Sequence, residues 1–261
     1  MPVAYLGDEY SYSHEAATAL ASGCMLRAYD TMSKVIAAVG NECAAAVLPV
    51  ENNTEGAVGE VFDALCDSKL FIQKQAVLPI THSLIAVEGG TIENVTRIVS
   101  HAQAIGQCRR FLSTLDCKVE AAPSTSAGLR LVDEHTAAIA FKPRAGQTVI
   151  ASGIQDSALN ATRFALVGTD KCVDGDTVSI LFDIKNEPGA LAKLLVCVYG
   201  HGINLTRIIS RPHRSGNGEY RFFADFEYGG TPDELDALVR ELGGYCTMLC
   251  VLGRYDVINI K

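Results

Sequence analysis

Short apolar segments alternate with polar turns and helical stretches in the first part of the chain, and this alternation limits the folds that it can adopt. Such runs predict strands at residues 3–7, 44–50, 97–99 and 137–140, and helices at 14–21, 58–65 and 102–112. This order is typical of an open, mainly parallel α/β sheet. Ligands of such sheets bind beyond the carboxyl ends of the strands, where helix N-termini offer backbone N–H groups to an anion such as a carboxylate.

Later segments predict a second lobe and a separate small unit. Residues 79–87 are expected to form a long strand that crosses into the second lobe, and residues 160–167 a strand that returns. After a polar connector the order becomes strand, helix, strand, strand, helix, strand, at 178–184, 189–199, 204–211, 220–228, 233–242 and 245–255. This order indicates a ferredoxin-like βαββαβ unit. We therefore expect a first domain at residues 1–171 and a second at 178–261.

Charge and apolar content exclude several classes of protein. The 22 Lys and Arg stand against 30 Asp and Glu, and the net charge of −8 argues against a nucleic-acid partner. No run approaches the roughly 18 apolar residues of a membrane span, and the first residues lack a signal-peptide pattern, so a cytoplasmic protein with no membrane partner is expected. Its nine cysteines should then be reduced. Cys246 and Cys250 are expected to pack on one face of a strand, and no metal site is predicted.

Three polar segments are specific in combination and order. They are Pro-Val-Glu-Asn-Asn-Thr-Glu-Gly at residues 49–56, Ser-His-Ala-Gln at 100–103 followed by Gln-Cys at 107–108, and Asn-Ala-Thr-Arg-Phe at 160–164. With them the chain resembles the prephenate dehydratases that carry a carboxy-terminal ACT regulatory domain. Further matches extend the resemblance over nearly the whole chain, at residues 4–7, 11–14, 81–84 and 124–127, and at the two amino-acid-binding motifs of the ACT part, 188–191 and 202–206 with 210–212.

The resemblance implies a fold, a reaction and a mode of regulation. Two α/β lobes like those of a periplasmic binding protein would hold the active site in a cleft and would join an ACT domain. The reaction would convert prephenate to phenylpyruvate in phenylalanine biosynthesis by losing carbon dioxide and hydroxide together, with no cofactor or metal. L-phenylalanine bound at interfaces between ACT domains would be the feedback inhibitor, in a homodimer or a homotetramer.

The leaving hydroxide of this reaction needs a hydrogen-bond donor, because negative charge develops on its oxygen in the transition state. By resemblance, that donor is Thr162. The other catalytic candidates are Asn52, Ser100 and Gln107. The candidates for substrate binding are Gln103, Ser124, Thr125 and Phe164. Neutral amide and hydroxyl groups of this kind can orient carboxylates without adding a titrating group.

Each catalytic candidate also has an ordinary structural interpretation. Ser100 could cap the helix that is expected from Ala102, and Asn52 could be a turn former. Gln107 could be an exposed helix residue, and Thr162 a β-branched strand residue. Their place in the family's motifs favours the catalytic interpretation.

Neighbouring residues suit supporting roles. Strand alternation places Arg163 opposite Thr162, where a structural ion pair is expected, and returns Phe164 to the side of Thr162, as a wall for the substrate ring or as core. Glu51 and Glu55 would repel a dianionic substrate and are expected to start a helix. The elimination has no obligatory base, so hydrogen-bonded scaffold roles are expected for His14, His82 and His101.

The regulatory part carries candidates of its own, and the chain departs from the family at three places. By resemblance, the effector-binding residues are Gly189, Ala190, Leu191, Asn204, Leu205 and Ser210. The family's Gly-Pro-x-Gly is Gly-Asp-Glu-Tyr at residues 7–10, and residues 140–146 depart from a Ser/Gly/Ala-rich run. Ile209 replaces a glutamate of the second effector motif. These departures leave the loops near the cleft and the strength of inhibition open.

Two other functions stay open at this point. The same elimination could act on arogenate, in which an amino group replaces the ketone of prephenate, and no residue of the sequence decides between the two. A two-lobed protein with an ACT domain could also be a non-catalytic amino-acid sensor. Retention of Asn52, Ser100, Gln107 and Thr162 together argues against a sensor, which would not need a leaving-group donor.

Overall fold

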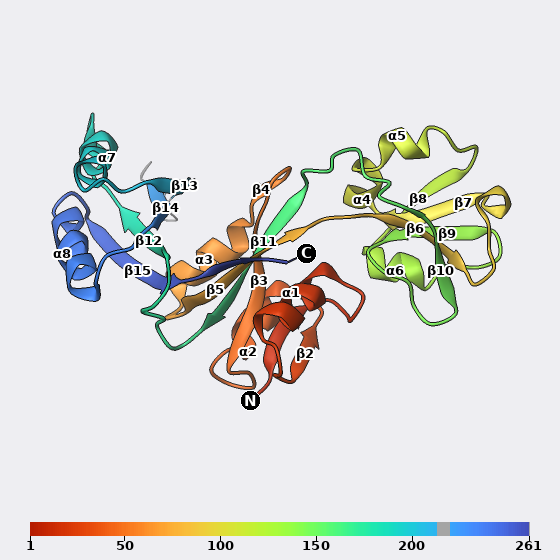
Figure 1. Ribbon diagram of the computed structural model, residues 1–261, viewed down its shortest axis with the longest axis horizontal. Helices are drawn as coiled ribbons and strands as arrows, with labels where there is room; N and C mark the ends of the chain where they lie inside the picture. Colours follow the sequence, from red (N-terminus) through yellow and green to blue (C-terminus); the bar gives the residue numbers. More distant parts are fainter. Residues whose placement is uncertain (213–219, 261) are drawn as a thin grey trace.

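The computed structural model describes residues 1–212 and 220–260, which form an elongated molecule of two α/β lobes and a smaller unit (Figure 1). The smaller unit runs from β12 to β15 and is called the regulatory unit below, after the role that the resemblance implies. The first lobe, in the middle of Figure 1, is a mixed sheet with the strand order β16-β5-β11-β3-β1-β2. Its strands are β1 (Val3–Leu6), β2 (Leu26–Tyr29), β3 (Ala45–Asn52), β5 (Phe71–Pro79), β11 (Ala161–Gly168) and β16 (Val257–Asn259), and a short β4 (Gly56–Ala57) pairs with β3. Its helices are α1 (Tyr12–Leu20), α2 (Met32–Ala38) and α3 (Gly59–Asp67).

Alternation along β1 explains why helices cover both faces of this sheet. Tyr5 packs in the apolar cluster on the α1 side, whereas Ala4 packs in the cluster that contains residues of α2 and α3. Ser11 caps α1 by accepting a hydrogen bond from the backbone N–H of His14. The start of α1 is thereby held at the carboxyl end of β1.

The second lobe is a mixed sheet with the order β10-β6-β9-β7-β8. Its strands are β6 (Ser83–Val87), β7 (Arg97–His101), β8 (Lys118–Ala122), β9 (Thr136–Ala140) and β10 (Gln147–Ser152). The helices are α4 (Ala102–Gly106), α5 (Arg109–Leu112), α6 (Thr125–Leu129) and a 3₁₀ turn (Ile92–Asn94). The single helix expected at 102–112 is thus divided into α4 and α5.

Two connections join the lobes. The segment predicted as one crossing strand at 79–87 is divided into β5 and β6 by residues 80–82, and β10 leads back to β11, the predicted returning strand. Because β11 enters the first lobe from the second, it runs antiparallel to both β3 and β5. The expectation of a mainly parallel sheet is therefore wrong at the centre of the first lobe, where the site lies.

The strands and helices of the regulatory unit follow one another in the predicted ferredoxin-like order. Its sheet has the order β13-β14-β12-β15 and is antiparallel. The strands are β12 (Thr177–Asp183), β13 (Leu205–Pro212), β14 (Tyr220–Glu227) and β15 (Met248–Tyr255), and the helices are α7 (Ala190–Gly200) and α8 (Pro232–Gly243). Gly189 precedes α7 in a left-handed conformation (φ 80°), and Thr231 and Glu234 form a capping box at the start of α8.

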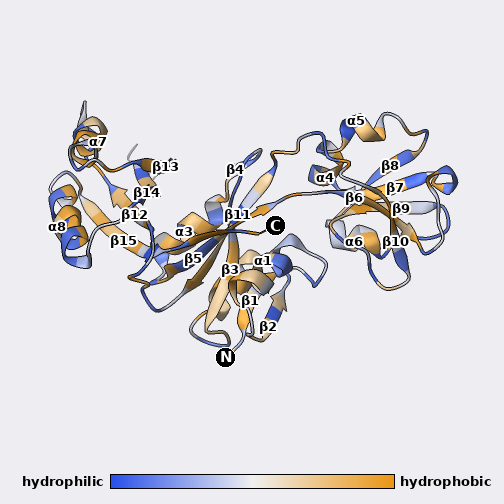
Figure 2. Ribbon diagram, viewed as in Figure 1, coloured by the Kyte–Doolittle hydropathy of each residue, from blue (hydrophilic) through white to orange (hydrophobic). Residues whose placement is uncertain are grey.

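The regulatory unit shares part of its core with the first lobe. The rings of Phe62 in α3 and Phe223 in β14 lie 4.4 Å apart, and both belong to one buried apolar cluster. Figure 2 shows apolar residues along the central strands of the first lobe up to this junction. At Gly253 a Cβ atom would lie 2.1 Å from the carbonyl oxygen of Ile72, so β15 can pass β5 this closely only with glycine.

The chain end does not stay in the regulatory unit. Residues 257–259, part of the range 178–261 expected for the second domain, form β16, which pairs in parallel with β5 of the first lobe. The regulatory unit is therefore held to the first lobe by a shared core and by β16, which the chain adds to the sheet of the first lobe. Among the described residues, no helix has the length and apolar character of a membrane span.

The two cysteines expected on one strand face lie apart. Cys246 precedes β15 and packs in the core of the regulatory unit, whereas Cys250 packs against the cluster shared with the first lobe. The expectation is wrong because β15 begins only at Met248, so strand alternation does not reach Cys246.

Candidate active site

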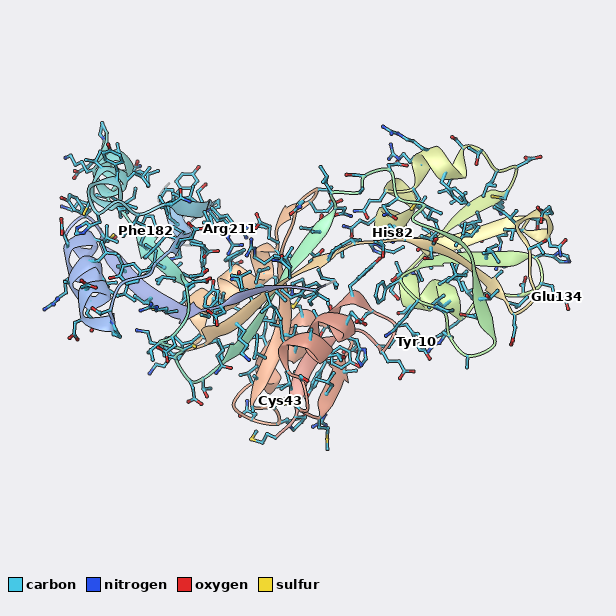
Figure 3. The ribbon with its side chains drawn as sticks, viewed as in Figure 1. Tyr10, Cys43, His82, Glu134, Phe182 and Arg211 are labelled. Atoms are coloured by element: carbon cyan, nitrogen blue, oxygen red, sulfur yellow. The ribbon has the colours of Figure 1, made fainter. Side chains whose placement is uncertain are left out.

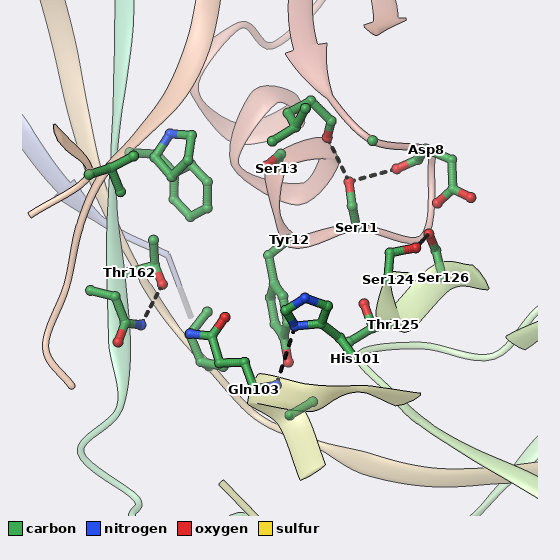
Figure 4. Close-up of a pocket in the computed structure, with 18 of the residues that line it drawn as sticks. Asp8, Ser11, Tyr12, Ser13, His101, Gln103, Ser124, Thr125, Ser126 and Thr162 are labelled. Atoms are coloured by element: carbon green, nitrogen blue, oxygen red, sulfur yellow. Dashed lines mark hydrogen bonds between the residues drawn. The ribbon is translucent and has the colours of Figure 1, made fainter. Parts of the chain in front are cut away.

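A cavity of about 1120 Å³ lies between the two lobes. The first lobe lines it with the segment after β1 and with the ends of β3 and β11, and the second lobe lines it with α4 and the start of α6. Figure 4 shows Thr162, Gln103, Ser124 and Thr125 around this space. The volume is that of a large small-molecule site.

Thr162 and Asn52 are paired directly across the antiparallel strands β11 and β3. The Nδ2 atom of Asn52 donates a hydrogen bond of 2.9 Å to Oγ1 of Thr162. Because an amide nitrogen can only donate, the hydroxyl oxygen of Thr162 is the acceptor, and its hydrogen stays available to a group in the cavity. Thr162 is only 9% exposed, and the bond polarises its hydroxyl and makes it a better donor.

Asn52 also forms the turn that follows β3. Its Oδ1 atom accepts hydrogen bonds from the backbone N–H groups of Thr54 (2.9 Å) and Glu55 (3.2 Å). Backbone N–H groups can only donate, so these bonds fix which end of the amide faces Thr162. The turn-forming and the active-site interpretations of Asn52 therefore describe one side chain.

Gln107 connects the second lobe to this turn. It follows α4, and its Oε1 atom accepts a hydrogen bond from Nδ2 of Asn160 (3.1 Å) and lies 2.8 Å from Nε2 of His82. Its Nε2 atom donates to Oγ1 of Thr54 (3.4 Å), and Oδ1 of Asn160 accepts from Asn52 (3.0 Å). A continuous hydrogen-bonded chain thus crosses the cleft from Gln107 to Asn52.

His82 stands at the crossover between the lobes (Figure 3) and is buried. The amide oxygen of Gln107 can only accept, so Nε2 of His82 carries a hydrogen, and Nδ1 lies 3.2 Å from the hydroxyl of Tyr12. Burial lowers the pKa of His82 by more than the bond to Gln107 raises it, so the ring is neutral near pH 7. This geometry is that of a hydrogen-bonded scaffold residue.

The four substrate-binding candidates all line the cavity. Ser124 is also the N-cap of α6, where its hydroxyl accepts a hydrogen bond of 3.0 Å from the backbone N–H of Ala127. Phe164 is 2% exposed and packs in the first lobe's core while lining the cavity, so the wall and the core interpretations both describe it. Lys34 and Arg130 also line the cavity, and each is paired there with an acidic residue, Asp30 (2.8 Å) and Asp8 (3.3 Å) respectively.

Comparison with known proteins identifies the family. Residues 3–172 match the family model described as prephenate dehydratase, and residues 178–243 match that of the ACT domain. The chain belongs to the prephenate dehydratase family. A protein named prephenate dehydratase from Lactococcus lactis subsp. lactis is 34% identical over 279 residues, which cover 100% of this chain and 99% of the relative.

Solved structures agree on the fold. A prephenate dehydratase from Arthrobacter aurescens, in complex with L-Phe, matches with a TM-score of 0.87 and 26% identity, over 98% of this chain and 90% of that one. A protein described as a novel type of quorum-quenching acylase also matches with a TM-score of 0.87, at 25% identity over 98% of this chain and 97% of that one. The predicted family and its two-lobed fold with an ACT domain are therefore confirmed.

Ser100 is the one catalytic candidate that does not line the cavity. It is 0% exposed, and its hydroxyl donates a hydrogen bond of 2.6 Å to the carbonyl oxygen of Ile139, which joins β7 to β9 away from the cavity. The alternative interpretation of Ser100 as a helix cap is wrong, because His101 caps α4 and accepts from the backbone N–H of Gln103. Position in a motif does not tell toward which side of a sheet a side chain points.

Three charged residues near Asn52 and Thr162 also differ from expectation. Arg163 lies opposite Thr162 as predicted, but its Nη1 atom donates to the amide oxygen of Gln75 (3.1 Å) rather than to a carboxylate. Glu51 and Glu55 do not start a helix. Glu51 lies in β3 and forms an ion pair with Arg207 of the ACT domain (3.1 Å), and Glu55 lies in the following turn and lines the cavity.

Tyr12 and Asn160 were missed as contributors to the site. The hydroxyl of Tyr12 donates to the carbonyl oxygen of Thr81 and lies beside His82, and Asn160 stands between Gln107 and Asn52. Both residues fall in segments that carry the family resemblance, at 11–14 and 160–164, and this was the available signal.

A second cavity of about 450 Å³ lies beside the start of α7 in the ACT domain. It is lined by three of the effector candidates, Gly189, Ala190 and Leu191. The other three lie outside it, in the edge strand β13 or just before it: Asn204, Leu205 and Ser210. The two groups of effector candidates are thus separated within one chain.

One cluster of metal-ligating side chains occurs among the described residues. Cys197, His201 and Glu241 bring their ligand atoms within 4.8 Å of one another on α7 and α8, outside the cleft. Within the cluster, Glu241 accepts hydrogen bonds from Cys197 (3.2 Å) and, when the ring is protonated there, from His201 (2.9 Å). These bonds give the three side chains partners without a metal ion.

Proposed function

We propose that this protein is a prephenate dehydratase, which converts prephenate to phenylpyruvate, carbon dioxide and water. The observation that carries the proposal is the Asn52–Thr162 pair, which leaves a polarised hydroxyl hydrogen facing the cleft. The ring hydroxyl of prephenate is the group that must leave, and Thr162 supplies the donor it needs. Family membership and the solved relative named for this activity support the assignment.

The reaction follows from position and polarity. With the ring hydroxyl of prephenate against Thr162, the bond to the ring carboxylate breaks, and its electron pair forms the new π bond of the aromatic ring. The C–O bond breaks in the same event, and the departing hydroxide takes a hydrogen bond from Thr162 and leaves as water once it is protonated. Aromatisation drives the step, so no covalent nucleophile is required.

Neutral hydrogen-bond donors on the cleft wall suit a substrate with two carboxylates. Gln103, Ser124 and Thr125 would hydrogen-bond the carboxylates, and the uncharged ring of His82 adds no competing charge. Asp8 also lines the cavity, but its carboxylate is paired with Arg130 at 3.3 Å. Stabilisation by neutral donors is strongest where charge develops, in the transition state.

Regulation by L-phenylalanine belongs to the same proposal. The cavity beside Gly189 would hold the amino acid, and β13 of a second copy of the chain would complete the site, because the two groups of effector candidates are separated within one chain. The enzyme would thus be a homodimer or homotetramer. We also propose a cytoplasmic location. Free cysteines, such as the exposed Cys24, are typical of proteins in a reducing compartment.

Turnover of three substrates tests the proposal. Purified protein is assayed with prephenate, with arogenate and with an N-acylated amine, the last because a protein described as an acylase shares the fold. Rapid formation of phenylpyruvate from prephenate, with slow or no turnover of the other two, is expected. Preference for arogenate would overturn the proposed substrate, and turnover of the N-acylated amine alone would overturn the reaction class.

A further inference from the structure

An ion pair joins the ACT domain to the strand that carries Asn52. Arg207 in β13 reaches into the first lobe, where its Nη1 atom lies 3.1 Å from Oε2 of Glu51, the residue before Asn52. Its Nη2 atom lies 2.8 Å from Oδ2 of Asp225 in β14. The side chains of Arg207 and Asp225 are only 10% and 5% exposed, so solvent screens this pairing little.

The strands β3 and β11 present different residues to their two sides at this point. Asn52 pairs with Thr162, and both line the cleft. Glu51, one residue earlier, pairs in register with Arg163 on the opposite side, toward the ACT domain. An anchor on Glu51 therefore acts on the backbone that positions Asn52, without contacting the substrate.

The pairing of β3 with β11 is irregular just before Glu51. Glu51 is paired with Arg163, but Phe164 is paired with Pro49, so Val50 is the extra residue of a bulge. A bulge interrupts the ladder of hydrogen bonds and re-aims the side chains beside it. The direction of Asn52 thus depends more on side-chain anchors here than it would in a regular strand.

The anchor itself is held from the ACT side. The second carboxylate oxygen of Asp225 accepts a hydrogen bond from Ser179, which also contacts the hydroxyl of the buried Tyr255. The guanidinium of Arg207 also lies 5.5 Å from the ring centroid of Phe62. Arg207 is therefore fixed between two carboxylates and an aromatic ring.

We propose that Arg207 is a positioning residue for the elimination. It holds Glu51, and through Glu51 it keeps Asn52 directed at the hydroxyl of Thr162. The inference rests on the proposed function, because it assigns a role to Arg207 in that reaction. It also gives the ACT domain a direct physical connection to the cleft, since β13 carries both Arg207 and the effector candidate Ser210.

The central variant is Arg207→Met, which keeps most of the apolar volume and removes both ion pairs. A small displacement of catalytic groups costs about 10²-fold in rate. We therefore expect kcat to fall roughly 10- to 100-fold, with KM within about threefold of the parent. Arg207→Lys should recover part of the rate, because one ammonium can pair with only one of the two carboxylates well.

A matched control separates this role from a general effect on the ACT domain. Arg221 pairs with Asp183 at 2.7 Å, also with largely buried side chains, but within the ACT sheet. Arg221→Met should leave kcat within about twofold of the parent. Loss of the same rate in Arg207→Met and Arg221→Met would overturn the proposal.

The decisive readout is the effect of Arg207→Met when Asn52 is already replaced. If Arg207 acts through Asn52, then adding Arg207→Met to Asn52→Ala should lower kcat by less than about twofold more. Independent losses that multiply would overturn the proposal. If Arg207→Met does not fold, Glu51→Gln tests the connection from its other end, with a fall in kcat expected and parent-like kcat contradicting it. Turnover of prephenate by the parent is measured first, so failure of the proposed function would be seen separately.

Discussion

The guanidinium carbon of Arg144 in the second lobe lies 4.3 Å from the ring centroid of Tyr10 in the first. Both residues lie where the sequence departs from its family, at 7–10 and 140–146. Two neighbouring contacts also join the first lobe to the second. They are a ring contact of 4.9 Å between Tyr12 and Phe141 and an ion pair of 3.6 Å between Glu15 and Lys142. The two altered loops are thus partners that hold the lobes together beside the cleft.

The first prediction concerns this inter-lobe contact. Tyr10→Ala removes a cation–π interaction of about 0.5 to 1 kcal/mol and should favour opening of the lobes. We expect KM for prephenate to rise roughly two- to fivefold with little change in kcat, measured by steady-state kinetics. Arg144→Ala should have the same effect, and the double variant should be no worse than either single one. Full additivity of the two variants would show that the contact does not contribute.

The second prediction tests the direction of the hydrogen bond to Thr162. Asn52→Asp keeps the oxygen that forms the turn with Thr54 but replaces the donor by an acceptor, which would draw the hydroxyl hydrogen away from the substrate. We expect kcat to fall roughly 10²-fold, with a melting temperature within a few degrees of the parent. The control is Asn53→Asp, since Asn53 is adjacent and its side-chain amide donates to the backbone carbonyl oxygen of Leu159 (3.0 Å) rather than to Thr162. A parent-like rate for Asn52→Asp would remove this bond from the mechanism.

The third prediction follows from the lowered pKa of His82. The unfolded chain binds a proton with a pKa of about 6.5, above that of the folded protein, so stability should fall as the pH decreases below this value. His82→Gln should therefore reduce the loss of melting temperature between pH 7.5 and 5.5. Part of the loss should remain, because burial also lowers the pKa of His14. The exposed His135 provides the control His135→Gln, and identical slopes for the parent and His82→Gln would contradict the assignment.

The fourth prediction concerns Ile209, which packs against the apolar cluster shared by the ACT domain and the first lobe. Arg207 and Arg211 flank it on the same side of β13, so the family's glutamate would stand between two positive charges. We expect phenylalanine to bind the parent but to inhibit it weakly, and Ile209→Glu to strengthen inhibition. Ile208→Glu, on the opposite, exposed side of β13, is the matched control.

Calorimetric binding of phenylalanine and inhibition of turnover are compared for the three proteins. Strong inhibition of the parent that Ile209→Glu leaves unchanged would show that coupling does not depend on this position. The effect to be detected is that of a typical allosteric coupling, about 1 to 3 kcal/mol.

Local sequence was sufficient for the elements that are buried on both sides. The uninterrupted apolar runs of β3 and β9 could be predicted because a strand covered on both faces needs no alternation. The strand β16 could not, because Val257, Ile258 and Asn259 form a strand only by pairing with β5 of another unit. Its existence is a tertiary property.

Prediction of the site from local sequence is limited in the same way. The motifs identified Thr162, Asn52 and Gln107, which the structure joins through shared hydrogen bonds, but they also pointed to Ser100, which faces Ile139 instead. The direction of a side chain depends on the packing of its strand, which a motif does not encode. Arg207 and Glu51 are 156 positions apart in the sequence, so no local pattern could predict their contact.

The proposed role of the Thr162 hydroxyl, as hydrogen-bond donor to the leaving group, is tested most directly by the turnover rate of Thr162→Val. Valine keeps the β-branched shape in β11 and removes the hydroxyl, which is both the donor to the leaving group and the acceptor for Asn52. Loss of such a donor costs roughly 3 kcal/mol at the transition state. We expect a fall in kcat of about 10²- to 10³-fold for prephenate with little change in KM, and partial recovery in Thr162→Ser. A kcat for Thr162→Val within about threefold of the parent would contradict it.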